Sequence, residues 1–559
     1  MVSDTSNEDT TTDEDEVERD ADLEEAELEA PAEPTPIEPE RAGISADHRN
    51  IMGGTAQNVL GVVVFALATA VAQVLMARSL DRGVFGVVTE ARLFAYIAAS
   101  ATRFGMDVAC VRLVAILIGR GEQGRVRRLV NRALGIAAAI SVGFGAVAFL
   151  IAGWLAGLFT PLPDAGRAAF QAAAVGIPLG ALAFTYLGAT RGFKIMRFTL
   201  YGQWAAQPVT WVLFMLAAWT IGYSAGLTTL AYSLSWGAAM LIGLYGWKKL
   251  TRGLGTSDEG VGVPEEHTGA LLRFGAFRAP AALFSHLIFF TDLYVLNYLW
   301  SRQGVAGALV SDAYGATIQV AQSLFLFLTS VSLTFSPFVA DLHHRQETER
   351  LNGLYKTVTR WALAATIPIM LVLAVVPEEV LRVFGKRYAV GAVPLRILIV
   401  GMIVPVMVGT VGFILIMVGR TGWDLLVYVA GFGIDVVVAA VLARPESLGM
   451  RGAAIAQACT LSFSAVVRLV LVHRFVHIWP FNRQYLRLVV PTVAAAVTVA
   501  GVHAVLPAQK WLVNLAGSAV AGTVVYGLLV LAIGLTPTER RTLAGLVKRF
   551  TGRAGAASR

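Results

Sequence analysis

Long apolar stretches alternate with short polar connections over most of this chain. About 20 apolar residues are needed to cross a bilayer as a helix, and runs of that length predict fourteen membrane helices. Their centres are expected near Phe65, Tyr96, Val142, Leu179, Val212, Met240, Phe289, Phe325, Met370, Met407, Phe432, Leu461, Ala496 and Val524. The pattern therefore predicts an all-α polytopic membrane protein.

The predicted connections alternate in charge. Lys and Arg gather in every second one, as in "WKKLTRG" and "HHRQETERLNGLYKTVTR". Cytoplasmic loops carry an excess of Lys and Arg, so both termini are predicted to be cytoplasmic. One predicted outer connection, "PEEVLRVFGKRYAVGAVPLR", departs from this alternation because it is itself basic, although its acidic residues partly offset the charge.

Parts of the sequence recur at a nearly constant spacing. "VFGVVTEARLFAYIA" from Val84 matches "AYGATIQVAQSLFLF" from Ala313 in a coarse aromatic and glycine pattern, at an offset of 229. The same offset places Arg191 on Arg420. We expect two parallel repeats of six helices, related by an axis along the membrane normal. Two further helices follow the second repeat.

These observations predict six segments. The expected order is a disordered acidic tail (1–50), an N-terminal lobe (51–247), a cytoplasmic linker (248–273), a C-terminal lobe (274–476), two extra helices (477–535) and a basic tail (536–559).

Composition agrees with the membrane assignment and shows that acidic and basic residues are unevenly distributed along the chain. The chain is 56% hydrophobic and 15% charged. Of its 38 acidic residues, 18 lie within residues 1–47, a tail that cannot build a core. The rest is strongly basic, which favours an anionic partner. Neither Cys110 nor Cys459 has a neighbouring Cys or His cluster, so we expect no disulfide, metal site or cofactor.

The span "VFGVVTEARLFAYIAASATRFGMDVACVR", residues 84–112, carries charge inside an apolar run. On a helix, one polar stripe at steps of three or four would contain Thr89, Arg92, Tyr96, Ser100, Arg103 and Asp107. About 16 Å of rise separates Arg92 from Arg103, so the two cannot reach the same interface. We hypothesise that the stripe lines a central cavity for a phosphate-bearing substrate, because arginine offers phosphate a planar fork of donors. The alternative is that both ends of the stripe anchor in headgroups.

Two carboxylates are expected deep inside later spans. Asp292 lies in "FFTDLYVLNYLW" and Asp435 in "GFGIDVVVA". A buried carboxylate needs a cationic partner or a proton. Both are candidates for coupling transport to an ion, and structural pairing with an arginine is the alternative.

No enzyme motif accompanies these charges. The sequence contains no Walker A loop, no H-E-x-x-H and no nucleophile elbow. We therefore expect a transporter rather than an enzyme. The enzyme alternative is a membrane glycosyltransferase or glycan ligase, which would need a long outer loop bearing acidic or His residues.

Several stretches resemble a known family. "ARSLDRGVFGVVTEARLF", "FGMDVACVRLVA", "GATRGFKIM", "DAYGATIQVAQSLFLFLTSVSLTFSPFVADL" and "MVGRTG" are similar, in order and spacing, to the oligosaccharide flippases of polysaccharide biosynthesis. That family, of O-antigen type, belongs to the multidrug/oligosaccharidyl-lipid/polysaccharide exporter superfamily. The likeness runs from about Asn58 to about Val472.

The resemblance implies two lobes around a central cavity and alternating access. It implies flipping of an undecaprenyl-diphosphate-linked oligosaccharide across a prokaryotic cytoplasmic membrane, for surface glycans such as lipopolysaccharide. Cavity candidates by this likeness are Arg92, Arg103 and Asp292. Arg78 and Arg82 stand at the outer end of the first helix and not within its apolar run. The chain therefore lacks the first-helix arginine pattern that the resemblance would imply for a lipid II flippase, which makes a lipid II substrate less favoured.

Three other functions stay open. One is a cation-coupled exporter of organic compounds from the same superfamily. The second is the glycan-transferring enzyme described above. The third is a scaffold that recruits glycan assembly enzymes through its acidic tail. We expect a monomer. Its expected surroundings are the lipid bilayer, and we expect it to bind no nucleic acid.

Overall fold

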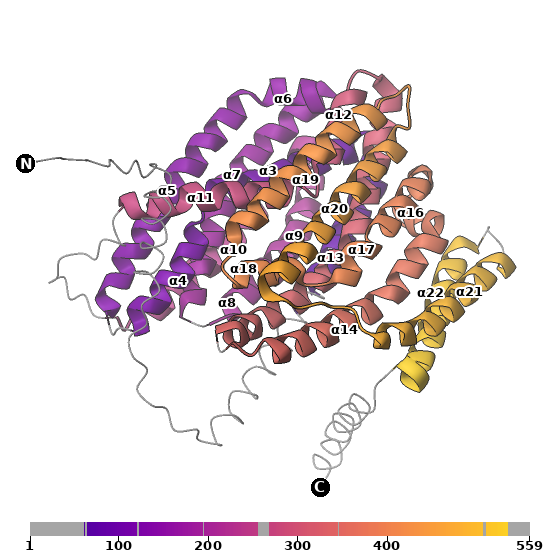
Figure 1. Cartoon of the computed structure of the whole chain (residues 1–559). Helices are drawn as coiled ribbons and strands as arrows, with labels where there is room; N and C mark the ends of the chain where they lie inside the picture. The colour runs from indigo at the N-terminus through magenta and orange to yellow at the C-terminus, as the bar shows by residue number, and fades with distance from the viewer. Residues whose placement is uncertain are drawn as a thin grey trace, which may run out of the picture. The chain divides into compact units, whose positions relative to one another are not determined.

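The apolar segments are helices in the computed structural model (Figure 1). The structure describes residues 61, 64–119, 122–193, 195–254, 268–344, 346–506 and 510–534, and these contain no strand. The chain divides into two units, Met1–Thr55 and Ala56–Arg559. All described residues belong to the second unit. The predicted acidic tail and basic tail lie outside the described residues.

The N-terminal half contains the helices up to residue 251. They are the first helix (Val64–Ser79), α3 (Val84–Thr102), α4 (Met106–Gly119), α5 (Gln123–Leu150), α6 (Ala152–Phe159), α7 (Pro163–Gly192), α8 (Arg197–Thr199), the π-helix η1 (Leu200–Ala206), α9 (Gln207–Trp219) and α10 (Ala225–Thr251).

The C-terminal half contains the remaining elements. They are α11 (Thr268–Leu287), α12 (Thr291–Trp300), α13 (Gly304–His344), α14 (Thr348–Val375), α15 (Pro377–Arg382), η3 (Lys386–Gly391), α16 (Ala392–Gly401), α17 (Ile403–Val408), α18 (Val411–Met417), α19 (Thr421–Leu442), α20 (Met450–Val476), η4 (Arg483–Leu488), α21 (Val489–Val505), α22 (Trp511–Leu529) and η6 (Val530–Gly534).

Among the described residues, ten helices are long and apolar enough to cross a membrane. The count is eleven if α11 and α12, which meet at a bend of 62°, form one broken span. The chain is therefore an all-α, multi-pass membrane protein. The figure of fourteen spans and the lobe boundaries stay predictions.

Local chemistry explains where the long helices begin. Pro163 opens α7, where its missing N–H costs nothing, and Asp164 follows in the first turn, which suits the positive end of the helix dipole. Ser224 caps α10 by accepting a hydrogen bond from the Leu227 backbone N–H at 3.2 Å. These two helices pack along each other in the N-terminal half.

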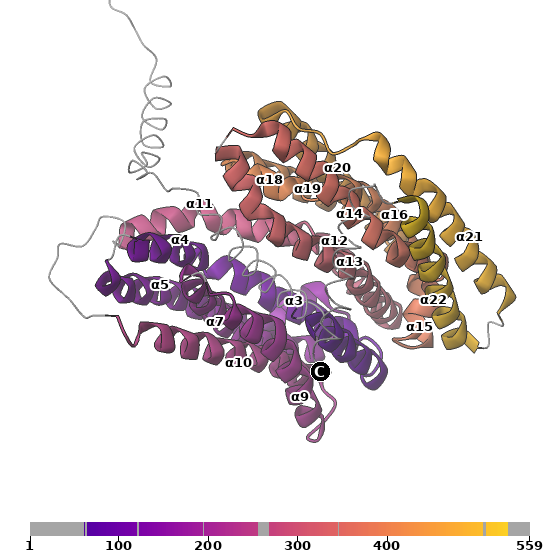
Figure 2. The same ribbon diagram turned by 90° about the horizontal axis from the view of Figure 1, so that it is seen from below.

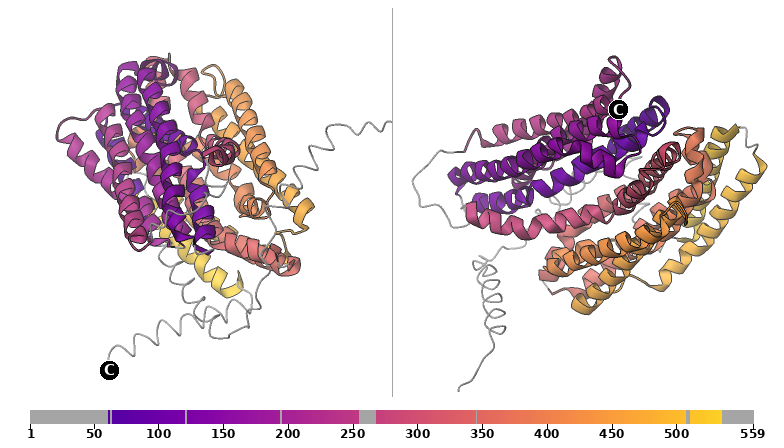
Figure 3. Two further views of the ribbon diagram at one scale, coloured as in Figure 1. Left: turned by 90° about the vertical axis from the view of Figure 1, so that its left-hand side faces the viewer. Right: turned by 90° about the horizontal axis from the view of Figure 1, so that it is seen from above.

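Each half packs around one long helix. In the N-terminal half, α7 contacts α3, α4, α5, α6 and α10. In the C-terminal half, α20 contacts α12, α16, α17, α18 and α19. Helices α21 and α22 pack on each other and on α14. They lie on the side of the C-terminal half away from α7 and α10 (Figures 2 and 3).

The halves meet through α3, α11 and α13. Helix α3 contacts both α11 and α13. Figure 2 shows α11 running beside α4, and α11 also contacts α19 in the C-terminal half. Helix α11 therefore bridges the two halves, although most of its sequence, from residue 274 on, belongs to the predicted C-terminal lobe.

Candidate functional site

The charged span is not one continuous helix. Helix α3 ends at Thr102 and α4 begins at Met106. Phe104 and Gly105 between them have φ of 55° and 70°. This left-handed backbone is easy for glycine and strained for phenylalanine. The predicted stripe therefore breaks at Arg103, and the residues before and after it do not share one helical face.

The break is packed against α11. Gly275 of α11 leaves room for the Phe104 ring, which a Cβ at that position would overlap. The Arg278 side chain lies beside Gly105, within 2.8 Å of where a Cβ would stand. Close packing across the halves thus supports the strained Phe104 backbone. Such strain persists only where surrounding structure holds it.

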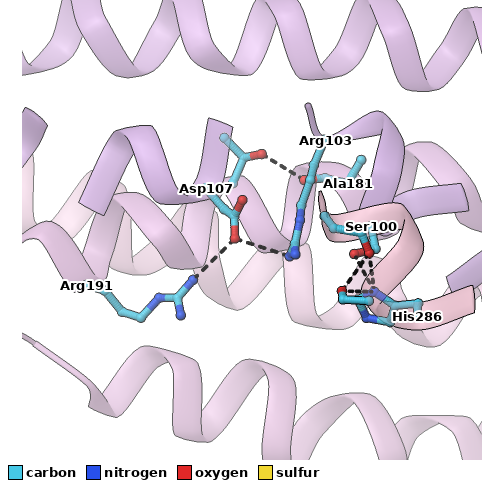
Figure 4. Close-up of polar contacts among 9 residues, drawn as sticks. Ser100, Arg103, Asp107, Ala181, Arg191 and His286 are labelled. Atoms are coloured by element: carbon cyan, nitrogen blue, oxygen red, sulfur yellow. Dashed lines mark hydrogen bonds and ion pairs between the residues drawn. The ribbon is translucent and has the colours of Figure 1, made fainter. Parts of the chain in front are cut away.

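Three charged side chains converge at this break, those of Arg103, Asp107 and Arg191, and we call them the Arg103 cluster. An Arg103 guanidinium nitrogen lies 3.2 Å from the Asp107 carboxylate, and an Arg191 nitrogen from α7 lies 3.9 Å from the same oxygen. Figure 4 shows both arginines directed at Asp107. Asp107 is 6% exposed in its side chain, whereas Arg103 and Arg191 are 16% and 29% exposed. One carboxylate therefore faces two partly accessible cations.

Aromatic and uncharged polar side chains border this cluster. Arg103 lies over the Phe184 ring, 4.7 Å from its centroid. The Tyr96 ring lies 5.1 Å from the His286 ring, which comes from α11. Ser100 and His286 face each other at 3.5 Å (Figure 4). The structure thus brings together four of the predicted residues, namely Tyr96, Ser100, Arg103 and Asp107, and adds Arg191 and His286.

Arg92 lies elsewhere. Its guanidinium sits 5.1 Å from the Trp211 ring centroid and 5.4 Å from that of Tyr232, among helices of the N-terminal half. The residue is 7% exposed, and its Nε and one Nη have no hydrogen-bond partner among the described residues. The structure does not join it to the Arg103 cluster.

Asp292 and Asp435 meet in the C-terminal half, at the break between α11 and α12. Both are fully buried. Tyr314 donates its hydroxyl to Asp292, and Thr460 donates to Asp435 at 3.4 Å. The two carboxylates are close enough to interact electrostatically. Among the described residues, neither aspartate forms an ion pair, so the predicted arginine partner is not observed there.

Glutamine side chains hold the end of α11 at this break. Gln457 donates to the Ile288 carbonyl at 3.2 Å, and Gln322 donates to the Phe289 carbonyl at 2.6 Å. These bonds satisfy carbonyls that the interrupted helix leaves free. Broken helices of this kind are where transporters place ions and substrates.

Four oxygen atoms near the break are buried and have no hydrogen-bond partner within the described part of the chain. They are one carboxylate oxygen each of Asp292 and Asp435, the Gln457 side-chain carbonyl and the Ser464 hydroxyl. Oxygen ligands of this kind suit hard cations, and two adjacent buried carboxylates need a cation or a proton. The described residues contain no group of three or more His, Cys, Asp and Glu that could hold a metal. A set of two carboxylates and neutral oxygens fits a monovalent cation or a proton.

A third polar cluster, which sequence reasoning missed, joins the halves near the start of α3. Asp312 of α13 accepts hydrogen bonds from the Gly83 and Gly86 backbone N–H groups, each at 2.8 Å. The Arg387 guanidinium lies 3.7 Å from Asp312. Glu90 accepts further bonds from Ser311 and Asn297. We call these residues the latch: Gly83, Gly86, Glu90, Asn297, Ser311, Asp312 and Arg387.

The latch closes one end of the contact between halves. It lies at the N-terminal end of α3, whereas the Arg103 cluster lies at the C-terminal end. Arg387 also donates to the Ala77 and Leu80 carbonyls at 3.0 and 3.1 Å. The side chain through which the basic connection, predicted to be outer, contacts the interface is therefore Arg387. This connection departs from the charge alternation of the loops, and that departure was the one signal in the sequence that could have pointed to the latch.

No family model and no curated protein matches this chain, but several solved structures share its fold. The lipid II flippase MurJ in an inward closed conformation superposes with a TM-score of 0.59 at 13% identity, covering 84% of this chain and 98% of that one. An inward-facing multidrug resistance transporter of the MATE family and MOP superfamily gives 0.60 at 14% identity, covering 76% and 98%.

A point mutant of the Vibrio cholerae MATE transporter VcmN gives a TM-score of 0.57 at 11% identity, covering 80% of this chain and 100% of that one. At such low sequence identities, the superpositions show a shared fold and nothing about the substrate. This chain shares the fold of MurJ and of MATE transporters over most of its length.

Proposed function

We propose that this protein transports a polyprenyl-diphosphate-linked oligosaccharide across the cytoplasmic membrane of a prokaryote by alternating access. The observation that carries the proposal is the Arg103 cluster. Two arginines share one carboxylate at a helix break beside the bridging helix α11. A diphosphate is the anion that such a site would recognise, because the guanidinium fork matches phosphate oxygens.

The cluster suits a site that binds and releases its ligand. Asp107 keeps the two guanidinium groups together while no ligand is bound, because it offsets part of their repulsion. A diphosphate can take over from that carboxylate without removing arginine from its place over Phe184. Tyr96, Ser100 and His286 then border the site with aromatic and hydrogen-bonding groups, which suit the sugar beyond the diphosphate.

The latch supports alternating access. It holds the halves together at the end of α3 opposite the Arg103 cluster. Breaking it is the step that would open that end of the interface. With both termini cytoplasmic, as the loop charges predict, the latch lies at the outer face and the Arg103 cluster toward the cytoplasm.

The acidic pair supplies a means of coupling. Asp292 and Asp435 lie at the α11–α12 break, and α11 also packs beside the Arg103 cluster. Binding of a monovalent cation or a proton between the carboxylates would change the charge at the break. One element, α11, thus connects the ion-coupling candidates with the substrate site.

A second candidate function is export of organic cations driven by an ion gradient. The observation in its favour is the same acidic pair, which is deeply buried and, among the described residues, makes no ion pair. The two functions differ in the charge of the cargo. An excess of arginine near the break in the charged span favours an anionic cargo.

Reconstitution distinguishes the two. Purified protein in liposomes would be given an NBD-labelled undecaprenyl-diphosphate-linked saccharide, with dithionite added to bleach the outer leaflet. We expect protein-dependent loss of the protected fraction, reduced by Arg103→Ala but not by Arg197→Ala, a matched arginine that lies 5.0 Å from the Phe198 ring. Transport of organic cations in the same vesicles without lipid flipping would contradict the proposal.

A further inference from the structure

The basic connection that is predicted to be outer forms a pocket, which shares only Arg387 with the latch. The pocket has a volume of about 430 Å³. Its lining includes Arg78, Arg382, Phe384, Lys386, Arg387 and Trp511. These residues come from the end of the first helix, the α15–η3 connection and the start of α22. Three separate parts of the chain thus bring four cations to one place.

The charge of this pocket is only partly neutralised. Arg382 lies 3.8 Å from Glu378, and Arg387 lies 3.7 Å from Asp312. No ion pair among the described residues involves Arg78 or Lys386. Four cations and two carboxylates leave two positive charges in excess. A mobile anion is what would balance them.

Arg78 and Arg387 fix the pocket wall by donating hydrogen bonds to backbone carbonyls. Arg78 Nε donates to the Val383 carbonyl at 2.7 Å, and Arg387 donates to the Ala77 carbonyl at 3.0 Å. Gly385, with φ of 139°, allows the tight turn that places side chains of the connection around the pocket. Within the described ranges, Arg382 and Lys386 make no such bond to the first helix and can turn toward a ligand.

We propose that this pocket is a docking site for the diphosphate of a lipid on the side of the protein predicted to be outer. Its volume lies in the range of small-ligand sites, enough for a diphosphate but not for an oligosaccharide beside it. Trp511 at its rim is a residue type typical of the membrane interface. Val520 and Val524 on α22 are exposed apolar residues, as a helix surface in contact with lipid requires.

This site deepens the proposed function, on which the identity of its ligand rests. A lipid-linked diphosphate that has passed the latch would meet the excess charge before it leaves the protein. The anion site itself rests only on the pocket and its charges. Failure of transport and failure of this site can therefore be told apart.

Protection of Lys386 from acetylation tests the site directly. Full-length protein in nanodiscs of zwitterionic lipid, accessible from both faces, would be treated with sulfosuccinimidyl acetate and analysed by peptide mass spectrometry. With undecaprenyl diphosphate at ten times its dissociation constant, we expect Lys386 acetylation to slow by about tenfold. Lys249, at the far end of α10, is the internal control and should not change. Undecaprenol, which lacks the diphosphate, should not protect.

Matched variants separate the pocket from the central cluster. Arg382→Gln should raise the dissociation constant about tenfold, because one charged donor is lost. At the same ligand concentration, Lys386 acetylation should then slow by only about twofold. Arg302→Gln, an exposed arginine outside the pocket, should leave the protection unchanged. Protection that persists when transport is absent would keep the site and remove the proposed function.

Three results would overturn the inference. Equal protection by inorganic diphosphate would show a free-anion site rather than a lipid site. Equal protection by phosphatidylglycerol would show a general phospholipid headgroup site. Unchanged Lys386 acetylation with every probe would show that the pocket binds no phosphate.

Discussion

Asp312→Asn should open the latch. In the wild-type protein, the two Asp312 oxygens each accept a backbone N–H of the α3 start at 2.8 Å. Asparagine has nearly the same shape but offers one acceptor oxygen and one NH₂ donor. One backbone N–H would then face another donor, and the ion pair with Arg387 at 3.7 Å would be lost.

The size of the effect follows from these contacts. A hydrogen bond to a charged group contributes about 1.5–3 kcal/mol, and a buried donor left without a partner costs about 1–3 kcal/mol. Losing one such bond and weakening the other should destabilise the latched conformation by roughly 2–4 kcal/mol. Since about 1.4 kcal/mol is tenfold, the ratio of open to latched protein should rise by roughly 30- to 1,000-fold.

Thiol labelling at the base of the latch would measure this shift. Thr89 is 1% exposed and lies against Gly315 of α13, where the halves touch. Thr89→Cys, in a background with Cys110 and Cys459 replaced by alanine, would report on opening to a water-soluble maleimide. We expect at least about tenfold faster labelling in the Asp312→Asn variant.

Asp81→Asn is the matched control, because Asp81 is an exposed carboxylate in the same turn before α3. Its labelling rate should equal that of the wild type. If Asp312→Asn protein stays folded and monodisperse yet labels at the wild-type rate, the two hydrogen bonds do not hold the halves together and the reasoning fails.

The other predictions concern packing and coupling. Gly86→Ala should also speed labelling, because its Cβ would stand 2.9 Å from the α13 backbone; unchanged labelling would refute close packing there. Gly188→Ala should cost about 1–3 kcal/mol in thermal unfolding, because its Cβ would stand 2.5 Å from the Asp107 carbonyl oxygen of α4, whereas a Cβ at Gly135 meets nothing within 4 Å, so Gly135→Ala should not destabilise. Asp435→Asn should remove the dependence of flipping on a sodium or proton gradient, whereas Asp164→Asn should not; a retained dependence would exclude Asp435 as the coupling group.

Hydropathy predicted the helices well because the bilayer demands long apolar segments that satisfy their own backbone hydrogen bonds. Thirteen of the fourteen predicted centres lie inside helices, and Phe289 lies in the α11–α12 break. The breaks were not predicted. Phe104 takes a left-handed backbone only because Gly275 lets its ring pack there, which is a tertiary effect. The adjacent Gly105 was the only local signal.

The two segments that match at the offset of 229 meet in space. Positions 86 and 315 differ by the offset of 229, and both are glycines at the α3–α13 contact. Gly86 faces Ser311, and Gly315 faces Thr89. The match that suggested duplication therefore also marks a contact between the halves, which the sequence alone did not indicate.

The candidate site could be predicted only in part. Spacing of three and four along the chain grouped Tyr96, Ser100, Arg103 and Asp107, whose positions depend on one short stretch. It could not find Arg191 or His286, which arrive from α7 and α11 through tertiary packing. It also grouped Arg92 with Arg103, although side chains on one helical face can contact different neighbouring helices.

The lipid-linked glycan pool shows whether the protein flips this lipid in cells. A strain deleted for this gene would be complemented with the wild-type protein, Arg103→Ala or Arg197→Ala, and its undecaprenyl-diphosphate-linked saccharides would be measured. If the protein flips this lipid, a completed oligosaccharide should accumulate facing the cytoplasm in the deletion strain. Arg103→Ala should fail to clear it, whereas the other two proteins should clear it. An unchanged pool and unchanged surface glycan in the deletion strain, with no second protein compensating, would contradict the account.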